Sequence, residues 1–387
     1  MQQVRFSPID PMTQSTGTIN QYMRRQIHDV PLWGCRVQIE IELAQVLMPD
    51  GKRHVEDCDF VDKGYYYTKR FCRMISGLCR HMTISAVAKN FGLRWETVKN
   101  IDKAYLQETL PSLHPETLTN LKYLGVDEVA KAKGHDYMTL VYDLDPHSDR
   151  PGQLILVHPG RKAEVLSKFF TMLPDATKQG ISVVAMDMGP AYQKAVRETL
   201  PNADIVLDRF HVMQNFCKAM DNQRRAEFRK ADDAQKKLIV GSRYLLLKHS
   251  EKLTETQSDQ LKTLLHENQN INSLYILKEQ LQTLWKNETV SSMQTALDAW
   301  CQLADETDMT YLKKFSKLLR KHKIGICNYA KYHLTTACIE AHNVGIGLIR
   351  KRARGIHDTD YFALKIRQLS VPDKEPIFYR KIAWATS

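Results

Sequence analysis

The chain has 387 residues, of which 43% are hydrophobic and 26% charged, which is enough for about two to three domains with buried cores. This composition excludes a disordered tail and a small protein held together by disulfides. Lys and Arg number 55 against 44 Asp and Glu, and the resulting net charge of +11 favours a polyanionic partner without identifying it.

The sequence indicates a soluble protein. No apolar run approaches the roughly 18 residues that a membrane span needs, and the first residues lack the basic and apolar regions of a signal peptide. The eight cysteines are scattered and form no CxxC pair, so we expect reduced thiols. We therefore expect a cytoplasmic, nucleoid-associated protein with no membrane partner.

The N-terminal region, residues 1–67, has little regular pattern. Residues 1–35 are polar, contain Pro8, Pro11 and Pro31, and predict an arm or an irregular lead-in. Residues 36–47 alternate polar and apolar side chains in their first half, which predicts one half-buried strand whose partner is unclear.

A helix-turn-helix spacing lies within residues 68–118. Ala88 is followed by Gly92 four residues later, then by Val98 six residues after Gly92 and by Ile101 three residues after that. A small residue lets two helices cross closely, glycine permits the turn, and the two apolar residues anchor the second helix. The residues expected to face outward and bind DNA are Arg94, Trp95, Thr97, Lys99 and Asn100. An ordinary helical hairpin is the alternative.

Residues 119–211 predict a mixed sheet with helices on its faces. Short β-type runs and helical runs follow one another in the order β-β-β-α-β-α-β, which is typical of such a sheet. The predicted strands are 123–130, 137–144, 153–159, 182–187 and 203–207, and the predicted helices are 161–173 and 190–200.

Only helical periodicity is found from about Arg209 to Leu334. Leucines recur there at three- and four-residue steps, which predicts a helical bundle over residues 212–334. The spacing is clearest at Leu261, Leu264, Leu265, Leu277, Leu281 and Leu284. Residues 335–387 then predict a helix, a strongly basic segment and a final amphipathic run.

Three acidic residues are candidates for a metal site. Asp127 lies in the first predicted strand and Asp187 ends the fourth, and these two strands can be neighbours in a mixed sheet. Carboxylate oxygens are the ligands that Mg²⁺ or Mn²⁺ prefers, and two such ions can activate one oxygen and stabilise another in phosphoryl transfer. Glu340, at the start of the predicted C-terminal helix, is the third candidate. Taken singly, each acid could equally be a cap or a surface residue.

The order of elements and acids resembles the ribonuclease-H-like catalytic fold of DDE transposases, and several strings resemble bacterial insertion-sequence transposases of the ISL-three type. The strings are LGVDEVAKAKGHDYMTLVYDL, MDMGPAYQKAV, LDRFHVMQNF, IEAHNVGIGLIRKRARGIHD and YFALKIRQL. The resemblance implies an α/β mixed fold in which a helix-turn-helix domain precedes a ribonuclease-H-like sheet, and residues 212–334 interrupt that sheet as an all-helical insertion. It implies that residues 119–211 and 335–387 together form the catalytic core.

The same resemblance implies site residues. Asp127, Asp187 and Glu340 would hold two Mg²⁺ ions, for which Mn²⁺ can substitute, and would catalyse DNA cleavage and strand transfer. Asp208 and His211 resemble the family's DxxH signature, although Asp208 as a helix cap and His211 as a packed side chain is an equal alternative. The amide-rich approach to the glutamate is kept at Asn343.

The sequence also differs from the family that it resembles. Relatives usually begin with a cysteine-rich zinc ribbon, whereas this region has only the isolated Cys35, Cys58 and His54, so we expect no zinc. Gly347 stands where related enzymes often have Lys or Arg, and Arg350 or Lys351 is the expected substitute. The basic segment expected to follow the DNA backbone comprises Arg350, Lys351, Arg352 and Arg354.

These features predict a transposase that binds double-stranded DNA, both the inverted terminal repeats and the target. Joining two ends implies a homodimer or a higher oligomer on DNA. Two alternatives stay open: a helix-turn-helix regulator with an inactive ribonuclease-H-like domain, and a structure-specific nuclease that cleaves without joining.

Overall fold

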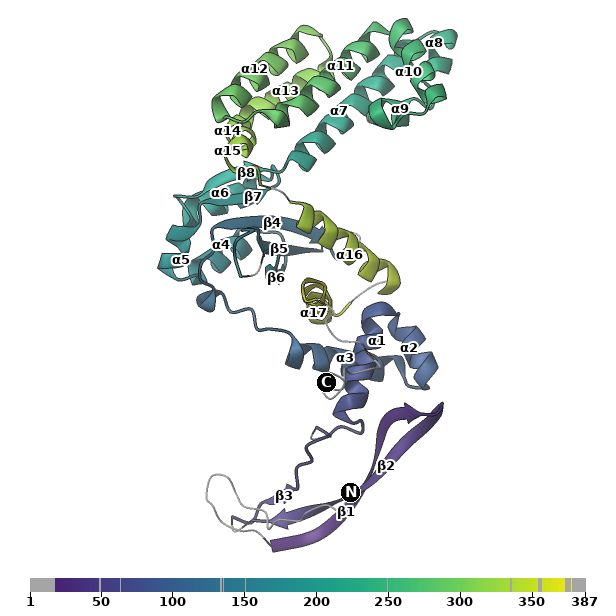
Figure 1. The fold of residues 1–387 in the computed structure, drawn as a ribbon, viewed down its shortest axis with the longest axis vertical. Helices are drawn as coiled ribbons and strands as arrows, with labels where there is room; N and C mark the ends of the chain where they lie inside the picture. The colour runs from purple at the N-terminus through teal and green to yellow at the C-terminus, as the bar shows by residue number, and fades with distance from the viewer. Residues whose placement is uncertain are drawn as a thin grey trace, which may run out of the picture. The chain divides into compact units, whose positions relative to one another are not determined.

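The computed structural model describes residues 18–48, 50–62, 64–132, 134, 136–149, 151–248, 250–334, 336–353, 357–372 and 377 (Figure 1). The chain divides into two compact units. The terminal unit comprises Met1–Pro111 and Leu348–Ser387, and the central unit comprises Ser112–Gly347. All eight cysteines lie among the described residues and are free thiols, as predicted.

The terminal unit begins with a long antiparallel hairpin. Strand β1 (Thr18–Leu32) pairs with β2 (Cys35–Leu47), and the short β3 (Arg53–Val55) pairs with the other edge of β2. The strand predicted at residues 36–47 is confirmed, but the irregular lead-in is wrong for residues 18–32. Most of β1 is exposed on both faces, so it is held by ladder hydrogen bonds and lacks the apolar alternation that identifies a half-buried strand.

Three helices follow the hairpin. They are α1 (Lys69–His81), α2 (Ile84–Phe91) and α3 (Trp95–Thr109). The hydroxyl of Thr83 caps α2 by accepting the Ala86 N–H, and Gly92 ends it with φ +60°. Val98 and Ile101 of α3 are buried in the core of this group, as the helix-turn-helix spacing predicts.

The last helix among the described residues, α17 (Thr359–Ser370), packs on α3 through a buried polar network. Asp102 of α3 is fully buried and accepts hydrogen bonds from the Ser76 hydroxyl at 2.5 Å and the Tyr361 hydroxyl at 2.5 Å. The Lys365 ammonium lies 3.1 Å from the same carboxylate. This network groups residues after Gly347 with the helix-turn-helix, whereas the predicted boundaries place all of residues 335–387 with the catalytic core.

The central unit contains a five-stranded sheet in the order β6-β5-β4-β7-β8. Its strands are β4 (Tyr123–Ala130), β5 (Tyr137–Asp143), β6 (Leu154–Pro159), β7 (Val183–Met186) and β8 (Asp204–Leu207). Strand β4 is antiparallel to β5 and parallel to β7, and β7 is parallel to β8. The mixed sheet is confirmed, and so is the expectation that its first and fourth strands are neighbours.

Helices cover both faces of this sheet. The helices α4 (Ala163–Met172), α5 (Asp175–Gly180) and α6 (Pro190–Thr199) join the strands after β6, and α4 and α6 bury Phe170 and Val196 in the same core as Leu124. Gly125, the next residue of β4, faces the other way, where a Cβ atom would overlap the side chain of Ile339. Ile339 belongs to α16 (Ala337–Ala353), so the missing side chain of Gly125 lets α16 approach the sheet closely.

Between β8 and α16 the described residues are helical. The helices are α7 (Arg209–Lys230), α8 (Asp233–Ile239), α9 (Arg243–Leu247), α10 (Glu255–Glu267), α11 (Gln269–Thr283), α12 (Val290–Glu306), α13 (Thr310–Lys321), α14 (Lys323–Cys327) and α15 (Tyr329–Tyr332). Three short 3₁₀ helices of the central unit are η1 (Pro115–Thr117), η2 (Ser250–Lys252) and η3 (Leu284–Lys286). No helix in the described part of the chain is long and apolar enough to cross a membrane.

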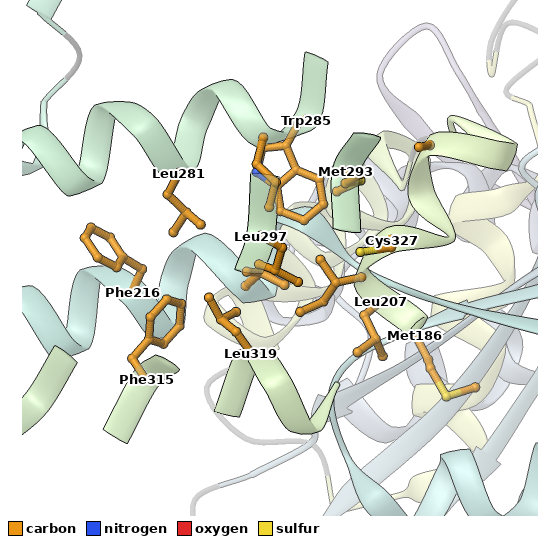
Figure 2. Close-up of a cluster of buried hydrophobic side chains, with 14 of the residues drawn as sticks. Met186, Leu207, Phe216, Leu281, Trp285, Met293, Leu297, Phe315, Leu319 and Cys327 are labelled. Atoms are coloured by element: carbon orange, nitrogen blue, oxygen red, sulfur yellow. The ribbon is translucent and has the colours of Figure 1, made fainter. Parts of the chain in front are cut away.

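The helical segment shares one hydrophobic core with the sheet. Figure 2 shows the side chains of Met186 and Leu207, from strands β7 and β8, continuing into those of Leu297 and Phe216 from the helices. Asn328 reinforces this junction by donating its amide hydrogen to the Ile205 carbonyl at 3.0 Å. The helical segment is therefore packed against the sheet edge that leads to α7.

Candidate active site and DNA-binding elements

Asp127 and Asp187 occupy matching positions on neighbouring parallel strands. The pairing of β4 with β7 runs from Tyr123 opposite Val183 to Gly125 opposite Ala185, and the same register extended by two residues places Asp127 opposite Asp187. Asp187 directly follows β7, and its carboxylate accepts the Gly189 N–H at 2.8 Å. The sheet thus brings together two acids that are far apart in the sequence.

The Asp127 side chain is half-buried, and its carboxylate accepts two hydrogen bonds. Its oxygens accept the Glu128 N–H at 2.8 Å and the Asn343 side-chain amide at 2.6 Å. Burial raises the pKa of Asp127, as does the nearby Asp187 charge, while the hydrogen bond from Asn343 lowers it. A carboxylate whose charge is disfavoured by burial and by a neighbouring carboxylate is a place where a cation is stabilised.

Asp208 and His211 lie at the start of α7, beside these acids. Asp208 caps the helix by accepting the Phe210 N–H at 2.8 Å, and its other oxygen lies 3.1 Å from the His211 ring nitrogen Nδ1. The hydrogen bond to Asp208 raises the pKa of His211, and the charges of Asp127 and Asp187 add to the effect. Asp208 therefore acts as the helix cap, one of the two roles considered for it from the sequence. His211 lies close enough to Asp127 and Asp187 for their charges to affect its pKa.

Glu340 lies on α16, one turn before Asn343, and its side chain is exposed. It lines a cavity of about 750 Å³ together with Asp208, Phe210 and Trp285. Among the described residues, no three His, Cys, Asp or Glu side chains are close enough to hold a metal ion. The structure thus brings Asp127 together with Asp187 and Asn343, and places Glu340 at the adjoining cavity.

The helix-turn-helix presents part of its predicted DNA surface to solvent. Arg94, at the N-cap of α3, is exposed, as are Trp95 and Asn100, whereas Thr97 is half-buried. Lys99 does not extend freely outward, because its ammonium pairs with the Asp358 carboxylate at 2.8 Å.

The predicted basic segment lies at the C-terminal end of α16. Arg350, Lys351 and Arg352 are exposed there, and Arg354 lies outside the described residues. Arg352 donates to the carbonyl of Arg80 at 3.4 Å, so this end of α16 contacts the helix-turn-helix within the terminal unit.

Comparison with known proteins agrees with both parts of this description. A family model described as a transposase, of the ISL3 type, matches residues 124–366, and a model described as the helix-turn-helix domain of transposase family ISL3 matches residues 56–106. The transposase of insertion sequence element IS1001 from Bordetella parapertussis is 31% identical over 89% of this chain and 84% of its own length. The transposase of insertion sequence element IS1557 from Mycobacterium tuberculosis is 25% identical over 84% of this chain and 76% of its own length.

The chain belongs to the ISL3 family of transposases. It therefore combines a helix-turn-helix DNA-binding domain with a DDE transposase domain.

DDE transposases normally use divalent metal ions, and the donor set of this transposase suits such an ion in part. The carboxylates of Asp127 and Asp187 carry hard oxygen donors at one level of the sheet. The side-chain oxygen of Asn343 is buried without a hydrogen-bond partner among the described residues, which leaves a further hard oxygen beside Asp127. The oxygen atoms of these three side chains are of the type that binds a divalent cation.

Sequence reasoning missed two groups beside the acids of this transposase. Burial raises the pKa of Glu128, and the charge of Asp187 raises it further, so Glu128 belongs to the same acidic field. Tyr192 of α6 shares a 2.7 Å hydrogen bond with the Thr139 hydroxyl, and burial raises its pKa to about 12. Glu128 follows Asp127 directly, and successive strand residues point to opposite faces, so the sequence pattern did not suggest it; nothing in a helix of mixed composition identified Tyr192.

Proposed function

We propose that this transposase binds the inverted terminal repeats of an insertion sequence and catalyses cleavage and transfer of DNA strands at Asp127, Asp187 and Glu340. The observation that supports this proposal best is the register between β4 and β7, which sets Asp127 opposite Asp187. A pair of carboxylates at one level of neighbouring strands is the arrangement that metal-dependent phosphoryl transfer needs.

Asp127 and Asp187 would hold divalent cations, and Glu340 would complete the ligand set from α16. Magnesium, when bound, would supply the positive charge that activates the attacking oxygen and stabilises the leaving one. Manganese is expected to substitute, because it prefers the same oxygen ligands.

The chain's own residues have separable roles in this proposal. Asn343 is a positioning residue, because its amide fixes the Asp127 carboxylate and ties α16 to β4. His211, oriented by Asp208, would offset part of the negative charge around the acids or contact a DNA phosphate. Arg94, at the N-terminal end of α3, is suited to guanine edges in a major groove.

The decisive experiment combines binding and cleavage on duplexes that carry the two ends of the element encoding this chain. Asp187→Ala and Glu340→Ala should bind these duplexes as wild type does, yet lose Mg²⁺-dependent cleavage by at least 100-fold. Glu198→Gln is the matched control, because Glu198 is an exposed acid of α6 paired with Lys194 at 3.7 Å. It should retain both activities.

The same experiment distinguishes the two rival functions. If wild type and Asp187→Ala bind equally and neither cleaves in Mg²⁺ or Mn²⁺, the chain is a DNA-binding regulator. If wild type cleaves but never joins a 3′-hydroxyl end to a second duplex, it is a nuclease. Joined products require that two ends meet, so sedimentation of the complex with DNA should show a dimer or a higher oligomer.

A further inference from the structure

The turn at the tip of the β1–β2 hairpin has an unusual residue. Leu32 pairs with Cys35 across a two-residue turn made of Trp33 and Gly34, both with positive φ, at +49° and +76°. Such turns normally contain Asn, Asp or Gly, because a bulky side chain is strained at positive φ. The Trp33 side chain is also 93% exposed. The indole therefore stabilises neither the turn nor a core, and strain retained in this way points to a function.

The hairpin is fixed beside the helix-turn-helix. Four residues before the tip, the buried Asp29 accepts a hydrogen bond from the Thr68 hydroxyl at 2.7 Å and binds the Arg70 guanidinium at the start of α1. On the other strand, the Arg36 guanidinium lies against Gly92, where a Cβ atom would overlap it. The tip is thus held at the turn that precedes α3, within one unit of the chain.

This position brings Trp33 within reach of DNA bound by the helix-turn-helix. Trp33 is three residues from Arg36, and a strand rises about 3.4 Å per residue, so the two are at most about 10 Å apart. The N-terminal residues of a recognition helix enter the major groove, which is about 12 Å wide. Arg36 itself reaches Gly92, two residues before the N-cap Arg94, so Trp33 lies near the end of α3 that would enter the groove.

The surroundings favour DNA as the occupant. Arg36, Lys89 and Arg94 are exposed cations on the hairpin, on the last turn of α2 and at the start of α3. Cations around an exposed aromatic ring suit a polyanion whose bases can stack on that ring. Proteins that contact a minor groove also insert apolar side chains between base steps.

We propose that Trp33 is a second DNA contact of this transposase: an apolar wedge that stacks against or between base pairs beside the groove read by α3. This inference rests on the proposed binding of element ends by the helix-turn-helix, and it adds a contact that the helix-turn-helix does not contain. The hairpin thereby extends the recognised DNA beyond the helix-turn-helix site.

Trp33→Asn tests the proposal without damaging the fold. Asn tolerates positive φ, so this variant should melt at or above the temperature of wild type. Affinity is measured without divalent metal, on duplexes carrying the element's ends and on a scrambled duplex. Trp33→Asn should weaken binding roughly 5- to 150-fold, as expected for the loss of one stacked base, and Trp33→Phe should retain most of the affinity. Ile19→Ala is the control, because Ile19 is an exposed apolar residue at the far end of β1.

A second readout reports the wedge itself. Duplexes with 2-aminopurine at successive positions should brighten at one or two steps with wild type and remain dark with Trp33→Asn. Equal affinities and equal fluorescence for the two proteins would overturn the inference, as would a Trp33→Asn variant altered only in self-association. The binding and fluorescence assays contain no divalent metal and do not depend on cleavage. A chain that binds these duplexes but never cleaves them would therefore contradict the proposed function and leave this inference standing.

Discussion

The buried ion pair between Asp102 and Lys365 gives the sharpest stability prediction. Asp102 is fully buried on α3, and the Lys365 ammonium of α17 lies 3.1 Å from its carboxylate and also donates to the Cys79 carbonyl at 3.2 Å. Lys365→Met keeps the aliphatic stem and removes the charge. The Asp102 carboxylate should then stay buried without a positively charged partner, with only the Ser76 and Tyr361 hydroxyls as hydrogen-bond donors.

The geometry sets the size of this effect. Two unit charges 3.1 Å apart in an effective dielectric of about 20 attract with about 5 kcal/mol. Removing one partner of a buried pair typically costs 3–5 kcal/mol, and we expect Lys365→Met to fall in that range, at about 4 kcal/mol. In a unit of roughly 150 residues this corresponds to a melting temperature lower by roughly 8–16 °C.

Hydrogen exchange measured by mass spectrometry on the full chain checks this value for one unit at a time. Peptides from α3 and α17 should exchange faster in Lys365→Met, and peptides from α7, in the central unit, should not change. Asp102→Asn should cost a similar amount alone, yet the double variant should recover at least about 1 kcal/mol of the summed cost because no unpaired charge remains. Additive single costs, or a Lys365→Met cost below about 1 kcal/mol, would refute the reasoning.

Three further outcomes are expected. Gly92→Ala should destabilise the helix-turn-helix by about 1–2 kcal/mol, because alanine is strained at φ +60° and its Cβ would displace Arg36, whereas Gly92→Asn should cost less in the same thermal melt. Trp300→Phe should lower the unfolding free energy in urea by about 1–2 kcal/mol, because it loses the 2.8 Å hydrogen bond to the Leu277 carbonyl, and an unchanged midpoint would contradict this. EDTA should abolish cleavage of end-containing DNA by wild type while leaving its binding intact, and Mn²⁺ should restore cleavage; activity that persists in EDTA would exclude the proposed metal requirement.

Some of the candidate site followed from the sequence. The helix-turn-helix was predictable because its constraints are local: Ala88, Gly92 and Val98 lie within one short segment, and each residue type matches a specific backbone demand. The neighbouring positions of Asp127 and Asp187 were predictable because few sheet topologies accommodate the observed order of strands and helices.

Other parts depended on contacts that leave no local pattern. Strand β1 is stabilised by its ladder with β2, so its side chains needed no alternation and the sequence indicated irregular structure. Lys99 looked like an outward-facing DNA contact, but its charge is paired with Asp358, more than 250 residues later in the chain.

The sequence alone determined the order of elements in the five-stranded sheet, the helix-turn-helix and the acids that stand on neighbouring strands, because periodicity, residue size and strand order act over short distances or restrict topology. Only the tertiary structure decided that α17 packs on α3, that Arg36 near the hairpin tip lies against the turn at Gly92, and that Asn343 binds Asp127. Such contacts form between residues that are far apart in the sequence. A charged or amide side chain that is buried in the fold has no distinctive local sequence pattern, because its burial and its partner are set only when the chain folds.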